Sequence, residues 1–143
     1  MSNKTKITVE VKINSPIEKV WECFTKPEHI IHWNFASDDW HCPKAYNDLK
    51  TLGKFSWRME AKDGSMGFDF EGIYNEVNEF EKIRYTLGDE REVEVIFKTQ
   101  NNFVIVTETF EAESSHTIEQ QREGWQAILN NFKKYIEKIK WCV

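Results

Sequence analysis

The sequence predicts an α+β fold in which a curved antiparallel sheet of six or seven strands wraps around one long C-terminal helix. Apolar and polar residues alternate over most of residues 54–111, and this period of two indicates strands with one buried face. After Thr117 the apolar period lengthens to about 3.6 residues, which indicates an amphipathic helix. The composition agrees, because ten Phe, six Trp and four Tyr accompany 22 Ile and Val but only four Leu.

The N-terminal part predicts one strand followed by two short helices. Residues 7–13 alternate as a strand with one buried face does. The motif Ser15-Pro16-Ile17-Glu18 then supplies an N-cap, a proline at the first helical position and a capping-box acid. A second short helix is expected over Pro27–Trp33. Residues 34–51 are expected to form a loop with room for one short strand near Ala45-Tyr46.

Five further strands are expected to follow as a meander. They are expected at residues 55–61, 66–77, 83–87, 93–97 and 103–111. Asp63-Gly64 is a strong hairpin signal between the first two of these strands. Gly72 lies inside the second strand, where a glycine indicates either a bulge or the close approach of another backbone.

The last element is expected to be one helix of about 22 residues. Thr117 and Gln120 have the spacing of a capping box at its start. The stripe expected to face the core consists of Ile118, Arg122, Trp125, Ile128 or Leu129, Phe132, Tyr135 or Ile136, and Ile139. The only large apolar surface that can cover this stripe is one face of the sheet. A strongly twisted sheet meets a straight helix along one line, so we expect a cavity roofed by the short helices and residues 34–51.

Composition and charge restrict the class of protein to which the chain can belong. No repeat or linker divides the chain, so a single domain over residues 1–143 is expected. The formal net charge of −5 argues against non-specific nucleic-acid binding, which depends on neutralising phosphates. The longest apolar run, Phe103–Val106, is far shorter than the roughly 20 residues of a membrane span. The N-terminus has no apolar signal core, and Cys23, Cys42 and Cys142 lack disulfide-framework spacing, so we expect reduced thiols in a cytoplasmic protein.

The space between sheet and helix is the strongest candidate for a binding site. Aromatic rings provide stacking surface with polar tips, which suits an apolar ligand that is aromatic or lipid-like. The same rings can instead fill the core completely, and the pattern leaves both outcomes open. The candidate lining residues are Trp57, Met59, Phe70, Tyr74, Tyr85, Phe97, Glu108, Trp125 and Leu129.

Glu108 is the one acid among these candidates, and its orientation depends on the phase of the last strand. If the strand buries Val104 and Val106, Glu108 faces inward and requires a partner or a raised pKa. It can then orient a ligand or act as an acid or base. If the strand instead buries Ile105 and Thr107, Glu108 faces outward. A solvent-facing or salt-bridged acid is the favoured interpretation.

No metal, cofactor or catalytic group is predicted. His29 and His32 lie three residues apart and His41-Cys42 follows, but a zinc site requires these side chains to converge, and their spacing does not dictate that. Surface histidines are therefore expected. The chain contains no nucleophile elbow, phosphate loop or dinucleotide-binding motif.

Several short motifs occur in a characteristic order between residues 5 and 138. They are Ile13–Trp21, Trp33, Asp48–Phe55, Met59, Asp63-Gly64, Gly72–Val77, Gly124-Trp125, Leu129 and Phe132. In order and separation they resemble the START-like (SRPBCC, helix-grip) superfamily and, within it, the stand-alone bacterial form of the activators of the heat-shock protein 90 ATPase. The chain departs at Leu52-Gly53, where members of that family often have Gly-Gly.

The resemblance implies a helix-grip fold and a choice between functions. The superfamily includes lipid carriers, hormone-binding proteins, aromatic polyketide cyclases and chaperone activators. We expect a non-enzymatic domain that binds an apolar small molecule, with no cofactor. The first alternative is a chaperone-regulating interaction domain, which rests on the resemblance alone. The second is an enzyme of cyclase or hydrolase type that uses a cavity acid such as Glu108.

Overall fold

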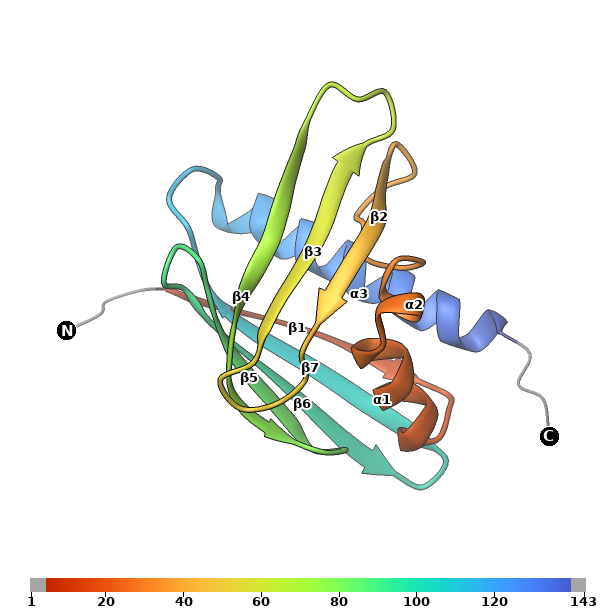
Figure 1. Cartoon of the computed structure of the whole chain (residues 1–143). Coiled ribbons are helices and arrows are strands. Elements are labelled where there is room, and N and C mark those ends of the chain that lie inside the picture. Colours follow the sequence, from red (N-terminus) through yellow and green to blue (C-terminus); the bar gives the residue numbers. More distant parts are fainter. Residues whose placement is uncertain (1–4, 140–143) are drawn as a thin grey trace.

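The fold is one antiparallel sheet with a long helix against its concave face (Figure 1). The structure is a computed structural model that describes residues 5–139. Its elements are β1 (Lys6–Ile13), α1 (Ile17–Thr25), α2 (Pro27–Ile30), β2 (Trp40–Asn47), β3 (Lys54–Ala61), β4 (Gly67–Asn78), β5 (Lys82–Leu87), β6 (Glu92–Gln100), β7 (Phe103–Glu111) and α3 (Ile118–Lys138). The strand order is β1-β7-β6-β5-β4-β3-β2. The predicted α+β helix-grip arrangement is therefore confirmed.

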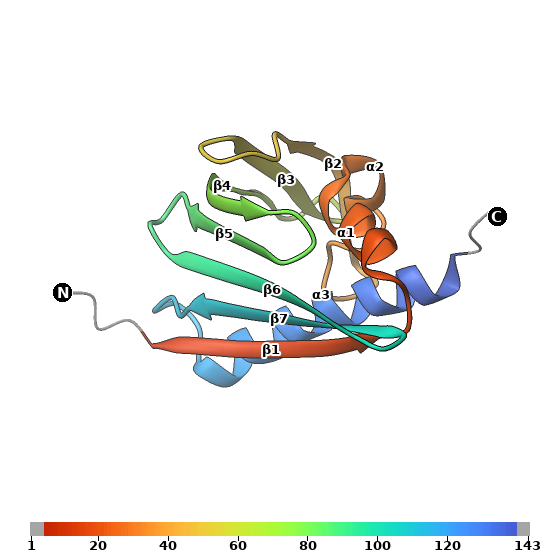
Figure 2. The same ribbon diagram turned by 90° about the horizontal axis from the view of Figure 1, so that it is seen from below.

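The sheet curls from β1, which lies beside α3, to β2, which packs against α2 (Figure 2). Leu129, Phe132 and Ile136 of α3 are buried, and each such side chain contributes roughly 1.5–3 kcal/mol by leaving water. The predicted capping box is present, with Thr117 and Gln120 bonded to each other's backbone. The start of the predicted stripe is wrong, however, because Ile118 and Arg122 are exposed. Within residues 5–139, no helix is long and apolar enough to cross a membrane.

The two short helices close one end of the space between sheet and helix. Phe24 of α1 packs edge-on against Phe132 of α3, with ring centroids 5.4 Å apart. Trp33 packs against Phe132 at 4.7 Å and donates its indole N–H to the Cys23 carbonyl oxygen at 2.8 Å. The predicted cap of α1 is wrong, because Pro16 is the N-cap residue and no side chain caps the helix. Helix α2 also ends earlier than predicted, at Ile30, and the chain continues to Trp33 as turns.

Strand β2 is the largest departure from the sequence prediction. Residues 34–51 were expected to form mainly a loop, yet Trp40–Asn47 form an eight-residue strand. Pro43 lies where the pairing with β3 shifts register, between His41 and Lys44. Proline lacks the N–H that a central strand needs but is tolerated at a bulge in an edge strand. The weak alternation of this segment reflects its position at the exposed edge of the sheet.

At Gly72 the backbone of β5 and the ring of Phe55 approach β4 closely, and the strand has no bulge there. It pairs with both Phe55 of β3 and Leu87 of β5. A Cβ at this position would lie 2.3 Å from the Thr86 carbonyl oxygen and 3.1 Å from the Phe55 ring. The register shift of β4 lies further along the strand, between Tyr74 and Glu76.

We predict that Gly72→Ala destabilises the fold, because the added methyl group has no space. Overpacking of this kind typically costs about 1–3 kcal/mol in the free energy of unfolding. Gly88→Ala is the matched control, since a Cβ there would meet no atom within 4 Å. Urea denaturation of both variants measures the difference. Equal stabilities of the two variants would contradict the close approach at Gly72.

Candidate functional site

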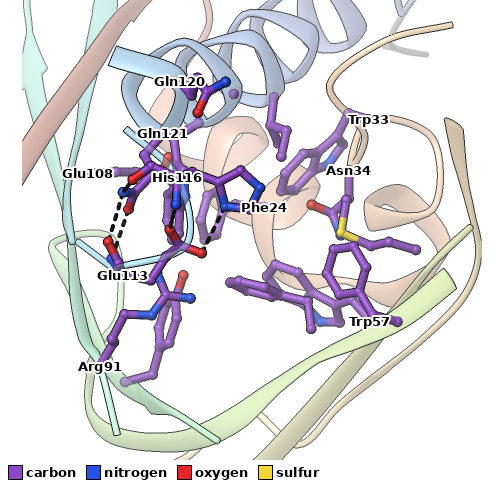
Figure 3. Close-up of a pocket in the computed structure, with 17 residues that line it drawn as sticks. Phe24, Trp33, Asn34, Trp57, Arg91, Glu108, Glu113, His116, Gln120 and Gln121 are labelled. Atoms are coloured by element: carbon purple, nitrogen blue, oxygen red, sulfur yellow. Dashed lines mark hydrogen bonds and ion pairs between the residues drawn. The ribbon is translucent and has the colours of Figure 1, made fainter. Parts of the chain in front are cut away.

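A cavity of about 300 Å³ lies between the concave face of the sheet and the first half of α3 (Figure 3). Its aromatic and aliphatic lining consists of Phe24, Trp33, Trp57, Met59, Phe68, Phe70, Tyr85, Trp125 and Ile128. Its remaining lining consists of Asn34, Arg91, Glu108, Glu113, His116, Gln120, Gln121 and Gly124. The aromatic rings therefore line a space instead of filling it.

The cavity exists because the two halves of α3 pack differently. In the second half, Leu129, Phe132 and Ile136 are almost fully buried against the core. In the first half, Gly124 has no side chain, and a Cβ added there would meet no atom within 4 Å. A glycine in a helix interior costs roughly 0.5–1 kcal/mol relative to alanine. The sequence thus has a destabilising residue where the helix faces open space.

The structure places six of the nine candidate residues around this cavity and three elsewhere. The six are Trp57, Met59, Phe70, Tyr85, Glu108 and Trp125. Tyr74 is buried, and its hydroxyl is hydrogen-bonded to the Asn47 side chain. Phe97 packs between Trp21 and Phe24 at the closed end of the core. Leu129 is 1% exposed within the packed half of α3.

Aromatic rings form a continuous wall from the helix to the roof. Trp125 stacks on Phe110 with centroids 3.9 Å apart and planes 10° apart. Phe70 meets Trp125 at 5.9 Å and Trp57 at 5.7 Å. Trp57 then meets Trp33 at 6.2 Å. Such contacts hold the rings in fixed orientations, so the wall presents preorganised faces and edges to a bound molecule.

Trp57 also contains an unsatisfied polar atom. Its indole N–H is buried, and no hydrogen-bond acceptor reaches it from the described part of the chain. An unpaired buried donor costs about 1–3 kcal/mol. The wall of the cavity therefore contains a tryptophan whose unpaired N–H lowers the stability of the fold.

Glu108 faces inward, which contradicts the favoured interpretation that it faces solvent. It lies on β7 between Val9 of β1 and Val95 of β6, and all three side chains are buried on the inner face of the sheet. Burial raises the pKa of the Glu108 carboxyl from 4.5 to about 8. No residue of the described range forms a hydrogen bond or ion pair with it. At neutral pH the side chain is therefore mostly an uncharged carboxylic acid.

A second group of polar residues lies on the same side of the cavity, opposite Trp33 and Trp57 (Figure 3). The Gln121 amide accepts from the Glu113 backbone N–H at 2.9 Å and donates to the Glu113 and His116 carbonyl oxygens at 3.0 and 2.9 Å. The His116 ring lies 2.9 Å from the Glu113 carboxylate, and this hydrogen bond lowers the pKa of Glu113. Arg91 is paired with Asp89 at 2.8 Å. The charges that line this side of the cavity are thus already compensated.

The histidines and cysteines do not converge. His29 hydrogen-bonds to the Tyr135 hydroxyl at 2.6 Å, and His32 stacks on the same Tyr135 ring. His41 lies 3.7 Å from Glu60 on the neighbouring strand. In residues 5–139, no three His, Cys, Asp or Glu side chains are grouped to hold a metal ion. Burial raises the pKa of the Cys23 thiol to about 12, which makes it a poor nucleophile.

Sequence reasoning missed most of the polar lining. Gln121 lies three or four residues before Gly124 and Trp125 on the same helical face, so correct phasing of α3 would have identified it. Arg91 and His116 lie outside the regular elements. No periodic pattern applies to them, so only the folded arrangement brings them to the cavity.

Comparison with known proteins identifies relatives over almost the whole chain. The family model described as Activator of Hsp90 ATPase homolog 1-like protein matches residues 14–137. The chain is similar to the solution structure of an AHSA1-like protein from Aeromonas hydrophila, with 45% identity, a TM-score of 0.88, and coverage of 93% of this chain and 92% of that one. It is also similar to the solution structure of a protein from Cytophaga hutchinsonii, with 48% identity, a TM-score of 0.81 and 92% coverage of each chain.

More distant similarity shows the fold alone. A crystal structure of a protein from Chromobacterium violaceum has 20% identity and a TM-score of 0.84, and the match covers 94% of this chain and 99% of that one. No match was found among curated proteins.

We predict that Glu108→Gln changes how stability depends on pH. The folded-state pKa of about 8 lies above the ordinary value of 4.5, so the contribution of Glu108 to stability is greatest below pH 4.5 and is lost as the pH rises through 8. The variant lacks this loss, so its stability relative to wild type should increase over that range, by up to about 5 kcal/mol. Denaturant unfolding at pH 5 and pH 9 measures the difference in the free energy of unfolding between the variant and the wild type. Glu123→Gln, on the exposed face of α3, should follow the wild type. Parallel curves for wild type and Glu108→Gln would contradict a buried acid.

Proposed function

The chain belongs to the family of Activator of Hsp90 ATPase homolog 1-like proteins, and within that family we propose that it is a non-enzymatic domain that binds an apolar small molecule, aromatic or lipid-like. The observation that carries the proposal is the cavity of about 300 Å³ between the sheet and α3. Its volume falls at the lower end of the range of small-molecule sites, which is about 300–1,000 Å³.

The chemistry of the lining supports the proposal. Binding sites for small molecules are mainly hydrophobic with a few polar groups that fix orientation. Here aromatic rings form one wall, and Glu108 with its polar neighbours lies opposite Trp57. The free, buried thiols of Cys23 and Cys42 support the proposed cytoplasmic location. Cys142 lies outside the described residues.

A chaperone-regulating function is the second candidate, and the family match over residues 14–137 favours it. An enzyme of cyclase or hydrolase type is the third, and the buried Glu108 is the group that would act as acid or base. A catalytic acid generally works with a second positioned group. Among the residues described, none is hydrogen-bonded to Glu108 to serve in that way. Binding is therefore the function that the geometry supports best.

We predict that Gly124→Leu abolishes binding in the cavity and leaves the fold intact. The leucine side chain would occupy open space, and replacing a helical glycine should not weaken α3. A panel of planar aromatics and fatty acids, followed by NMR, should give saturable shifts at Trp57, Tyr85 and Trp125 in the wild type. The affinity should fall at least tenfold in Gly124→Leu, which corresponds to about 1.4 kcal/mol. Glu123→Leu, on the exposed face of the same helix, should bind as the wild type does. The absence of shifts across the whole panel would refute the proposal.

The chaperone candidate predicts a different result with the same variant. Titration of the chain with the Hsp90 of the same organism should give saturable binding. Because Gly124 lines the cavity, Gly124→Leu should leave that binding unchanged if the contact is made by the surface. Isothermal titration calorimetry measures the binding of the chaperone to the wild type and to Gly124→Leu. If no heat of binding is detected at micromolar concentrations, the chaperone candidate fails and the small-molecule proposal is unaffected.

A further inference from the structure

Besides the Trp57 indole N–H, two hydrogen-bonding groups on the wall of the cavity have no partner among the described residues. They are the carboxyl group of Glu108 and the hydroxyl group of Tyr85, and both residues line the cavity. Glu108 is 7% exposed and Tyr85 is 3% exposed. In the part of the chain that the structure describes, neither group forms a hydrogen bond, even with the other. Neither oxygen is sealed from the cavity, because the Trp57 indole nitrogen is the one unpaired side-chain atom without accessible surface in the described residues, so a molecule in the cavity can pair with both groups.

The two groups are close enough to influence each other. The charge of Glu108 contributes to raising the pKa of Tyr85, although burial is the larger cause. Tyr85 of β5 lies opposite Val93 of β6, and Glu108 of β7 lies opposite Val95 of β6. Both therefore project from the inner face of the sheet, on the two strands that flank β6. A ligand that lies over β6 inside the cavity lies between the two residues, because both line the same cavity.

Both groups are donors at neutral pH. Glu108 is mostly protonated because its pKa lies near 8, and Tyr85 stays protonated because its pKa lies well above 10. An acid kept neutral by apolar surroundings can donate a hydrogen bond. The other titratable groups that line the cavity are Arg91, Glu113 and His116, and each is paired with a protein side chain. The facing positions Val9 and Val95 are apolar.

Two O–H donors that line one cavity match an oxygen atom with two lone pairs, which can accept from both. A carbonyl oxygen meets this requirement without carrying a charge into the cavity. A carboxylate would also accept both bonds, but moving an anion into an apolar site carries a much larger desolvation cost. The positive charge of Arg91 offsets only part of that cost, because Arg91 is already paired with Asp89. The wall of edge-on and tilted rings from Trp125 through Phe70 to Trp57 favours a planar aromatic body for the rest of the ligand.

We propose that Tyr85 and Glu108 together bind the carbonyl oxygen of an uncharged, planar aromatic carbonyl compound whose rings lie against the Trp125–Phe70–Trp57 wall. This inference deepens the proposed function and depends on the cavity being the binding site. It selects aromatic over lipid-like ligands and neutral ligands over carboxylates. The two donors also polarise the bound carbonyl group, because they stabilise negative charge on its oxygen.

The test compares three small molecules that share one ring system. These probes are 2-acetylnaphthalene, labelled with ¹³C at the carbonyl carbon, 2-ethylnaphthalene, which lacks the acceptor, and 2-naphthoate, which is anionic. At pH 6.5 the ketone should bind about tenfold more tightly than the hydrocarbon, because each good hydrogen bond contributes roughly threefold to tenfold. The ketone should also bind more tightly than the naphthoate. Its carbonyl ¹³C resonance should move downfield on binding. Between pH 6.5 and 9.5 its preference over the hydrocarbon should decline as Glu108 loses its proton.

Three variants separate the two donors. Tyr85→Phe removes one hydroxyl group and should reduce the preference for the ketone threefold to tenfold. Glu108→Leu should also reduce the preference for the ketone threefold to tenfold, and the remaining preference should not change with pH. Glu108→Gln keeps an N–H donor but cannot titrate, so it should keep the preference and lose its pH dependence. The preference is the ratio of the ketone and hydrocarbon affinities measured within each variant, and circular dichroism shows that each variant is folded.

The outcomes distinguish this inference from the proposed function. If the hydrocarbon binds as tightly as the ketone, or if Glu108→Leu keeps the preference, the carbonyl site is refuted and the apolar cavity stands. Equal binding of 2-naphthoate also refutes it. If none of the three probes binds while the wild-type chain is folded, the binding function itself fails, and the carbonyl site fails with it.

Discussion

The arrangement of this protein depends on how a straight helix meets a curved sheet. Helix α3 must cover its apolar side, and the sheet can follow it closely along part of its length only. The second half of the helix packs tightly through Leu129, Phe132 and Ile136. The first half stands away from β3 to β5, and the short helices close the remaining end. The cavity is thus a geometric consequence of twist, and side-chain identity decides only its size and polarity.

The polarity of the cavity has a cost in stability. Glu108 is buried without a partner, the Trp57 indole N–H is unsatisfied, and Gly124 weakens the helix interior. None of these features contributes to folding, and a fully apolar core with alanine in the helix would be more stable. Their common position around one space is the physical reason to assign that space a function.

The sequence was sufficient for the fold and for about a third of the residues that line the site. Strict alternation located β3 to β7, and the capping box located the start of α3 to one residue. Strand β2 was predicted only as a short strand near Ala45-Tyr46, because an exposed edge strand with Pro43 has no buried alternation. The phase of β7 was ambiguous because Val104 and Ile105 give both of its faces an apolar character, so only pairing with β1 and β6 determines that Glu108 faces inward. Arg91 and His116 reach the cavity from irregular segments, where no periodicity applies.

The edge strand β2 has a consequence for association between molecules. An exposed edge offers unpaired N–H and C=O groups on which a strand of another chain can build. In β2 this template is interrupted, because Pro43 provides no N–H and the bulge beside it breaks the spacing of the remaining groups. Continuous cross-molecular sheet extension is therefore blocked at this edge. The opposite edge of the sheet, β1, has neither a proline nor a register shift, so this interruption acts at the β2 edge alone.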